Sequence, residues 1–229
     1  MNENQVNVYV LTTNDKARVD LISDKLSSID FKFVKSDNEA SLIQLAKEYR
    51  KISHQFRKKA MMPGEIGAFK THAAAWQQIM KSNRPGIIIE DSADFVDDVS
   101  FLQSKQAYEQ IKRCGLISFV DYPYKLHFDK PTLFLDIPLK KAYPIRCYGL
   151  TPNRAAILLG SMNKKPYTMP VDKWMSIPKL SGCLGFVSHI GIAVRLRDLK
   201  SIANKSKGDK SYNPLNLIYR LINKYKYKY

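Results

Sequence analysis

The chain has 229 residues, of which 45% are hydrophobic and 25% are charged, and these proportions exclude a disordered protein and fit one globular domain with a sizeable core. No stretch is long and apolar enough to span a bilayer, and no apolar leader follows Met1, so we expect a cytoplasmic protein. The net charge of +16 is unusually high and points to a negatively charged partner.

The excess positive charge is concentrated near the carboxyl end. Segment 195–229 contains ten Lys or Arg residues and two Asp residues, a net charge of +8, which is half of the total. Such a segment attracts polyanions, either nucleic acid or an anionic membrane surface, and a merely solvated tail is the alternative. We therefore predict one folded domain over 1–194 and a basic, partly amphipathic tail over 195–229.

The first predicted elements alternate between strand and helix. Val and Tyr alternate with other residues in the opening segment, and a run with helical spacing of Val19, Ile22 and Leu26 follows it. The patterns predict a strand over 6–13, a helix over 15–29 capped by Asp15, a strand over 30–37 and a polar helix around 39–51. This β-α-β order is the beginning of an α/β sheet.

The next predicted element is a long helix. Pro63 and Gly64 break the chain, and the helix covers 65–81 with an apolar stripe of Ile66, Phe69, Ala73, Trp76 and Met80. Glu65 and His72 are two turns apart and fall within this stripe, where polar side chains need partners or a cavity. The two residues therefore form either a buried hydrogen-bonded pair or part of a site.

Strands and helices continue to alternate toward the carboxyl end. The patterns predict a strand over 86–90, a helix over 101–112, a strand over 115–122, irregular or hairpin structure over 123–144, a strand near 146–151 and a helix that begins near Pro152. Thr151 is placed to cap that last helix.

Carboxylates stand at the ends of two of these strands. Glu90 and Asp91 follow the apolar run "GIII", and Asp121 ends the strand over 115–122. Ligands of open α/β sheets bind at the carboxyl ends of strands, so the three acids are candidates for one site that holds a divalent metal and a phosphate. The alternative is that they are solvated loop acids that cap the next helix. The chain has no G-x-G-x-x-G, P-loop or G-x-S-x-G motif.

The segment "MMPGEIGAFKTHAAAWQQIMKSNRPGIIIEDSADF" resembles the central motif of glycosyltransferase family 25, the family of bacterial lipooligosaccharide galactosyltransferases. The matching residues are Pro63, Gly64, Glu65, Ile66, Gly67, His72, Trp76, Glu90 and Asp91. Weaker matches are the opening strand with Arg18, the segment "CYGLTPNRAAILL", and "MPVDKWM" at Asp172. The resemblance covers roughly residues 5–180 and is most specific over 63–91.

The resemblance implies a single α/β domain of GT-A type, with a mixed central sheet flanked by helices. It also implies an enzyme that moves galactose or glucose from a UDP-sugar to a hydroxyl of a lipooligosaccharide or another surface glycan, with inversion. A divalent cation, Mn or Mg, held by strand-end acids would neutralise the leaving diphosphate. Inversion needs one general base on the opposite face of the sugar.

The resemblance also suggests a role for each candidate residue. The expected substrate-binding residues are Arg18, Glu65, His72 and Glu90. The expected metal ligands are Asp91 and Asp94, with Asp94 in place of the third acid of the family pattern. Asp172 is our choice of general base because it lies in the matched element, and Asp121 is its competitor because it ends a strand.

Ser92 is the departure from the family pattern, which has a third acid at this position. A neutral hydroxyl lacks the charge that hard divalent cations favour. Three alternatives follow: Asp91 and Asp94 hold the metal, or Lys or Arg residues bind the diphosphate, or the chain is a catalytically impaired relative that only binds sugar nucleotide.

The tail suggests where the protein works. Asn213 and Pro214 can begin a helix with an apolar face of Leu215, Ile218, Leu221 and Ile222, which is typical of docking on an anionic bilayer. We expect docking at the inner face of the bacterial cytoplasmic membrane, near a lipid-linked acceptor; packing on the enzyme's own core is the alternative. The rival function is nucleic-acid binding, argued from "KYKYKY", but no nucleic-acid motif supports it.

Overall fold

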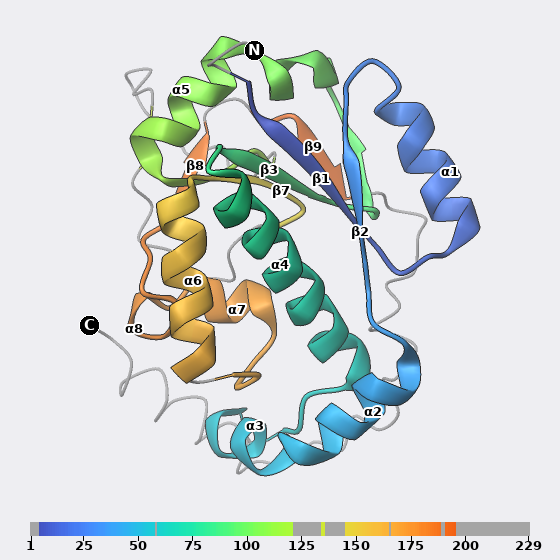
Figure 1. Cartoon of the computed structure of the whole chain (residues 1–229), viewed down its shortest axis with the longest axis vertical. Coiled ribbons are helices and arrows are strands. Elements are labelled where there is room, and N and C mark those ends of the chain that lie inside the picture. The colour runs from blue at the N-terminus through green and yellow to red at the C-terminus, as the bar shows by residue number, and fades with distance from the viewer. Residues whose placement is uncertain are drawn as a thin grey trace.

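The computed structural model describes residues 5–57, 59–120, 134–135, 145–164, 166–188 and 191–195 (Figure 1). The strands are β1 (Asn7–Thr12), β2 (Lys32–Lys35), β3 (Gly86–Glu90), β4 (Ala93–Phe95), β5 (Leu116–Ser118), β6 (Phe134–Leu135), β7 (Cys147–Leu150), β8 (Phe186–Ser188) and β9 (Ala193–Arg195). The helices are α1 (Lys16–Lys25), α2 (Glu39–Glu48), α3 (Arg50–Arg57), α4 (Pro63–Ser82), the 3-10 helix η1 (Val99–Gln103), α5 (Lys105–Cys114), α6 (Pro152–Lys164), α7 (Val171–Met175) and α8 (Pro178–Ser181).

Seven strands form one mixed sheet in the order β2-β1-β3-β7-β5-β8-β6. The strands β2, β1 and β3 are parallel, and β7 lies antiparallel between β3 and β5. Because β3 and β5 are both antiparallel to β7, their carboxyl ends meet at the same edge of the sheet. The predicted α/β fold with a mixed central sheet is confirmed, and β4 pairs with β9 in a separate two-stranded sheet.

Alternating apolar side chains place a core on each face of the sheet. Ile88 of β3 packs on one face with residues of α4, α6 and α7. Ile87 and Ile89 pack on the other face with residues of α1, α5 and η1. All three side chains are completely buried. The continuous apolar run of β3 is therefore explained by burial on both faces, and Glu90 is its first residue that reaches solvent.

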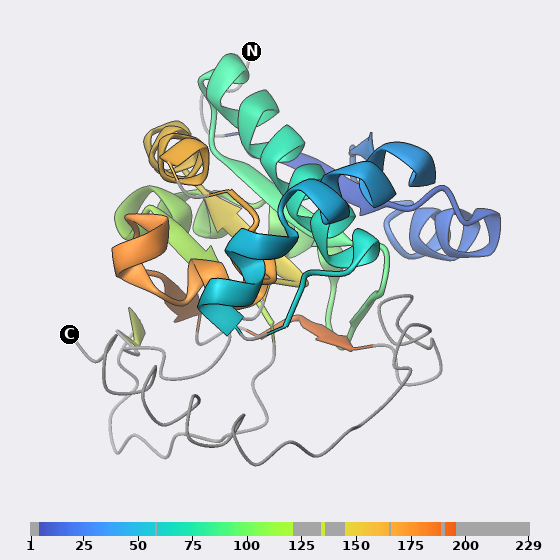
Figure 2. The same ribbon diagram turned by 90° about the horizontal axis from the view of Figure 1, so that it is seen from below.

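Helix α4 crosses the centre of the molecule, with α2 beside its first turns (Figures 1 and 2). Pro63 occupies its first turn, and Asn83 ends it in the left-handed conformation at φ 51°. Four residues of the predicted apolar stripe are buried, but Met80 is 41% exposed, so its inclusion was wrong. Ile79 is buried instead, because the last turn of α4 packs on the start of β3, where Ile79 contacts Gly86.

Other boundaries differ from the prediction in detail. The helix expected around 39–51 is two helices, α2 and α3. The helix expected over 101–112 is η1 followed by α5, since the Ser104 side chain accepts a hydrogen bond from the Ala107 N–H at 3.2 Å and starts α5. Asp121, most of segment 123–144 and the tail beyond Arg195 lie outside the described residues. Among the helices that the structure describes, none is long and apolar enough to cross a membrane.

Candidate active site

The first group of site residues lies where β1 and β3 end, at the carboxyl edge of the sheet. The Asp91 N–H donates to the Leu11 carbonyl at 3.0 Å, which holds Asp91 beside the end of β1. The Asp91 carboxylate accepts from the Thr13 N–H at 3.4 Å, and Arg18 Nη1 of α1 lies 3.4 Å from Asp91 Oδ1. The structure therefore brings together Arg18 and Asp91, two residues that the sequence assigned to the site.

This ion pair is buried, with side-chain exposures of 10% for Arg18 and 8% for Asp91. Burial raises the pKa of Asp91, and the Arg18 charge and the Thr13 hydrogen bond offset that effect only in part. The Arg18 contact favours the ionised carboxylate of Asp91, whereas the net result is a raised pKa. Burial prevails because the long contacts to Arg18 and Thr13 replace only part of the lost hydration.

Asp94 is also paired with a cation of α1. Lys25 Nζ lies 2.5 Å from Asp94 Oδ1, and this hydrogen bond is the main reason why the pKa of Asp94 is lowered. Ser92 donates its hydroxyl proton to Glu90 Oε2 at 3.2 Å. The described residues contain no group of three His, Cys, Asp or Glu side chains that could hold a metal ion. On their own they do not fit a metal site, and the metal roles of Asp91 and Asp94 stay predictions.

A second group is built on α4 and β7. The Trp76 indole N–H donates to the Tyr148 hydroxyl at 2.8 Å, and His72 Nδ1 lies 2.8 Å from the same hydroxyl. His72 Nε2 faces Glu90 Oε1 at 3.5 Å. His72 and Trp76 reach one hydroxyl because residues four apart share one helix face. We call these four residues the Glu90 network: Trp76, Tyr148, His72 and Glu90.

Donor and acceptor chemistry determines which atoms of this network donate and which accept. An indole N–H can only donate, so the Tyr148 oxygen accepts from Trp76. A neutral His72 that accepts from the Tyr148 hydroxyl at Nδ1 and a charged His72 that donates to it both carry a proton on Nε2, facing Glu90. Burial raises the pKa of Tyr148 well above its usual value, so the hydroxyl keeps its proton. The network is therefore arranged to present a donor to the Glu90 carboxylate.

Glu90 is the solvent-facing end of the network. Its side chain is 27% exposed, whereas that of His72 is 1% exposed. Burial on its own would raise the pKa of Glu90, but the His72 hydrogen bond and charge, the Arg146 charge and the Ser92 hydroxyl together lower it. The network thus delivers an ionised carboxylate to the edge of the sheet, where it can accept hydrogen bonds from a ligand.

Glu65 lies apart from this network. Its carboxylate accepts a hydrogen bond from the Met62 N–H at 2.9 Å and so caps the start of α4. The hydrogen-bonded pair of Glu65 and His72 considered from the sequence is not formed, because the two residues are seven positions apart, about 10 Å along the helix axis. The substrate-binding role of Glu65 stays a prediction.

The remaining candidates lie on other elements. Asp172 is in the first turn of α7, whose Trp174 stacks on Trp76 with ring centroids 6.1 Å apart. An element that contacts the network therefore carries Asp172, and its role as general base stays a prediction. Asp121 lies outside the described residues.

Sequence reasoning missed Tyr148 and Arg146. Tyr148 lies in the weakly matching segment "CYGLTPN", and its partners on α4 are 72 and 76 residues away. Arg146 precedes β7, and its carbonyl accepts the Glu90 N–H at 2.8 Å. The spacing of His72 and Trp76 indicated that the two share a face, but no local pattern identifies a partner so distant in the chain.

The motif that begins α4 also has a packing reason. A Cβ added at Gly67 would lie 2.8 Å from Leu42 Cδ1, so Leu42 of α2 packs directly on Gly67 and a larger residue there would displace its side chain. The motif residues thus start the helix, cap it and set its distance from α2.

Comparisons with known proteins identify the family of the chain. The family model described as glycosyltransferase family 25 (LPS biosynthesis protein) matches residues 6–175. No curated protein sequence matches the chain. A solved structure described as a glycosyltransferase involved in the glycosylation of the major capsid of PBCV-1 is similar over 86% of this chain and 94% of that chain, with 11% identity and a TM-score of 0.42. The family match covers most of the chain, which therefore belongs to glycosyltransferase family 25 and is a glycosyltransferase.

Proposed function

We propose that this enzyme transfers a hexose, galactose or glucose, from a UDP-sugar to a hydroxyl of a lipooligosaccharide or another surface glycan, with inversion and in a fold of GT-A type. The observation that carries the proposal is the Glu90 network, since it uses motif residues of the family to hold a carboxylate at a strand end. The family description as an LPS biosynthesis protein supports a glycan acceptor.

The proposed reaction is a single displacement. The acceptor oxygen forms a bond to C1 of the sugar while the bond from C1 to the phosphate oxygen breaks, and UDP leaves with the electron pair. The proton of the acceptor hydroxyl goes to the general base, for which Asp172 is the first candidate and Asp121 the second. Arg18, Glu65, His72 and Glu90 bind or orient the substrates.

The acceptor is proposed to be lipid-linked, so the enzyme would work as a peripheral protein at the inner face of the bacterial cytoplasmic membrane. The charge of the basic tail over 195–229 supports this location. The tail lies outside the described residues, and its role rests on the sequence.

The test is a panel of nucleotide sugars offered to the full chain, with manganese and with EDTA. We expect binding of UDP-galactose or UDP-glucose and release of UDP when acceptor glycan is added. NMR of the product should show an inverted anomeric configuration. Binding without turnover would instead support the catalytically impaired relative, and no binding of UDP in any condition would contradict the proposed donor.

The general base is tested by a matched pair of variants. D172N should reduce turnover by about 100-fold or more while UDP binding is retained, because the proton of the acceptor has no destination. D121N should leave most of the activity. The reverse result would assign the base to Asp121.

A further inference from the structure

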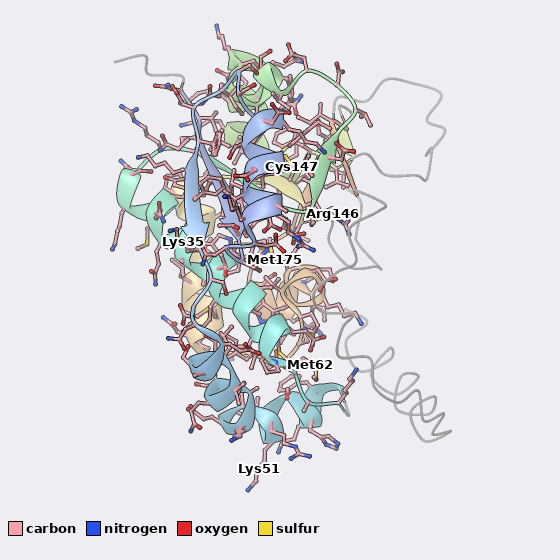
Figure 3. All side chains as sticks on the ribbon, turned by 90° about the vertical axis from the view of Figure 1, so that its right-hand side faces the viewer. Lys35, Lys51, Met62, Arg146, Cys147 and Met175 are labelled. Atoms are coloured by element: carbon pink, nitrogen blue, oxygen red, sulfur yellow. The ribbon has the colours of Figure 1, made fainter. Side chains whose placement is uncertain are left out.

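Arg146 stands out because its guanidinium lacks a direct partner within the described part of the chain. In the described part of the chain its guanidinium has no hydrogen bond and no ion pair, and its Nε is buried without a hydrogen-bond partner. A buried donor without a partner is unfavourable for folding. Figure 3 shows Arg146 beside Cys147 of β7, far along the molecule from Met62 at the start of α4.

The position of Arg146 ties it to the candidate active site. Its carbonyl accepts the Glu90 N–H at 2.8 Å, so the backbone places it opposite the last residue of β3. Its charge contributes to the lowered pKa of Glu90. Arg146 is therefore a cation at the carboxyl edge of the sheet, where ligands of such sheets bind.

The acids at the end of β3 and in β4 already have partners. Asp91 is paired with Arg18, and Asp94 is paired with Lys25. Glu90 is held by His72 and by the Ser92 hydroxyl. An acid in place of Ser92 would stand within hydrogen-bonding distance of Glu90 and add a further negative charge. With serine there, Arg18 and Lys25 are ion-paired with Asp91 and Asp94, whereas the partly buried Arg146 guanidinium has no ion-pair partner among the described residues.

We propose that Arg146 binds the diphosphate of the sugar nucleotide and stabilises it as the leaving group, an inference that rests on the proposed function. As the bond between C1 and the phosphate oxygen breaks, the electron pair moves onto the leaving phosphate and the guanidinium N–H groups donate to its oxygens. The proton of the acceptor hydroxyl goes to the general base. A guanidinium suits this task because its planar fork of N–H donors matches phosphate oxygens.

The experiment measures UDP and uridine binding to the full chain by calorimetry, in EDTA and in manganese. Uridine lacks the diphosphate and reports whether the nucleoside part of the site is intact. The variants are R146Q, which removes the charge, R146K, which keeps the charge without the fork, and R84Q, which removes the same kind of charge near the amino end of β3.

We expect R146Q to bind UDP about 10- to 100-fold more weakly in EDTA, with uridine binding unchanged, since hydrogen bonds to charged groups are the strong ones. R146K should lie between R146Q and the natural chain, and R84Q should match the natural chain. Equal UDP binding by R146Q and the natural chain, with or without manganese, would overturn the role of Arg146 and leave the proposed function intact. Failure of the natural chain to bind UDP would overturn both.

Discussion

Glu90 and Asp91 are neighbours in the chain, yet the protein moves their pKa values in opposite directions. Hydrogen bonds and positive charge lower the pKa of Glu90 against the effect of burial, whereas burial prevails at Asp91 and raises its pKa. Glu90 is therefore held ionised for use at the surface. Asp91 depends on Arg18 for its charge and holds α1 to the end of β3.

The pair of Arg18 and Asp91 should stabilise the fold in a pH-dependent way. In R18Q the buried carboxylate loses its cation, which should lower the free energy of unfolding by about 3 kcal/mol near neutral pH. Because the folded pKa of Asp91 is already raised and rises further in the variant, the loss should shrink as the pH falls toward that pKa and should be larger at about pH 8 than at about pH 5.

Urea denaturation at both pH values measures this effect. The control is K25Q, which removes the partly exposed partner of Asp94 and should lower the free energy of unfolding by less than about 1 kcal/mol. An R18Q loss that is the same at both pH values would show that the charge of Asp91 is not the cause.

The Tyr148 hydroxyl should be the most important single atom of the Glu90 network. Y148F leaves the Trp76 N–H and His72 Nδ1 buried without this partner, which should lower the free energy of unfolding by about 2 kcal/mol or more. Transfer activity should fall as well, because His72 loses the contact that orients it toward Glu90. Denaturation and activity measurements on one preparation check both expectations.

Tyr9 offers a matched control for this variant. It is buried in the same core as Tyr148 but makes no hydrogen bond through its side chain within the described residues. Y9F should change the free energy of unfolding by less than about 0.5 kcal/mol. Equal effects of Y9F and Y148F would contradict a special role for the Tyr148 hydroxyl.

Among the elements, β7 is the strand that joins the site to the core. It pairs with β3 and β5, carries Tyr148, and follows Arg146 directly. Its glycine, Gly149, lets α5 approach closely, since an added Cβ would lie 2.5 Å from Ile111 and 3.2 Å from Phe119. The close packing of β7 against α5 therefore fixes the strand that positions both residues missed by sequence reasoning.

G149A should lower the free energy of unfolding by about 1–3 kcal/mol, because the extra methyl overfills a packed core. The matched variant is G160A in α6, where an added Cβ meets nothing within 4 Å. That change should raise the free energy of unfolding by about 0.5–1 kcal/mol, since alanine favours helix over glycine. Thermal denaturation of the two variants should give shifts of opposite sign, and a stabilising G149A would contradict the packing argument.

At the scale of the whole molecule, the family match and the basic charge occupy different parts of the chain. The match covers residues 6–175, whereas half of the net charge lies in 195–229. This division supports a catalytic part and a separate part for attachment, which is the arrangement proposed for a lipid-linked acceptor.

The chain without residues 212–229 should bind vesicles of mixed phosphatidylserine and phosphatidylcholine about 1000-fold more weakly than the full chain, because its four basic residues each contribute about 1 kcal/mol near the surface. A variant with Arg220, Lys224, Lys226 and Lys228 changed to Gln separates charge from the apolar helix face. Sedimentation with vesicles measures both, and UDP binding should be unchanged. Unchanged vesicle binding would contradict the attachment role, and tighter binding to single-stranded RNA would favour the nucleic-acid alternative.

Sequence patterns between neighbouring residues determined much of what could be predicted. Periodicity and capping residues placed β1, α1, α4 and β3 within a few residues of their observed bounds, because these signals act between residues close in sequence. The same local signals failed where a single residue decides a boundary, as at Ser104 before α5. The motif over 63–91 also sufficed to indicate the family.

Only the tertiary structure decided which side chains meet. Arg18 and Asp91 are 73 residues apart, and Tyr148 lies 72 and 76 residues from its partners on α4. Such contacts depend on strand order and register, here the insertion of β7 between β3 and β5, which no local pattern encodes. The sequence by itself thus determined the elements, the family and the acids at the strand end. The fold decided that Glu90 is held by a buried network and that Arg146 lies beside it without an ion-pair partner among the described residues.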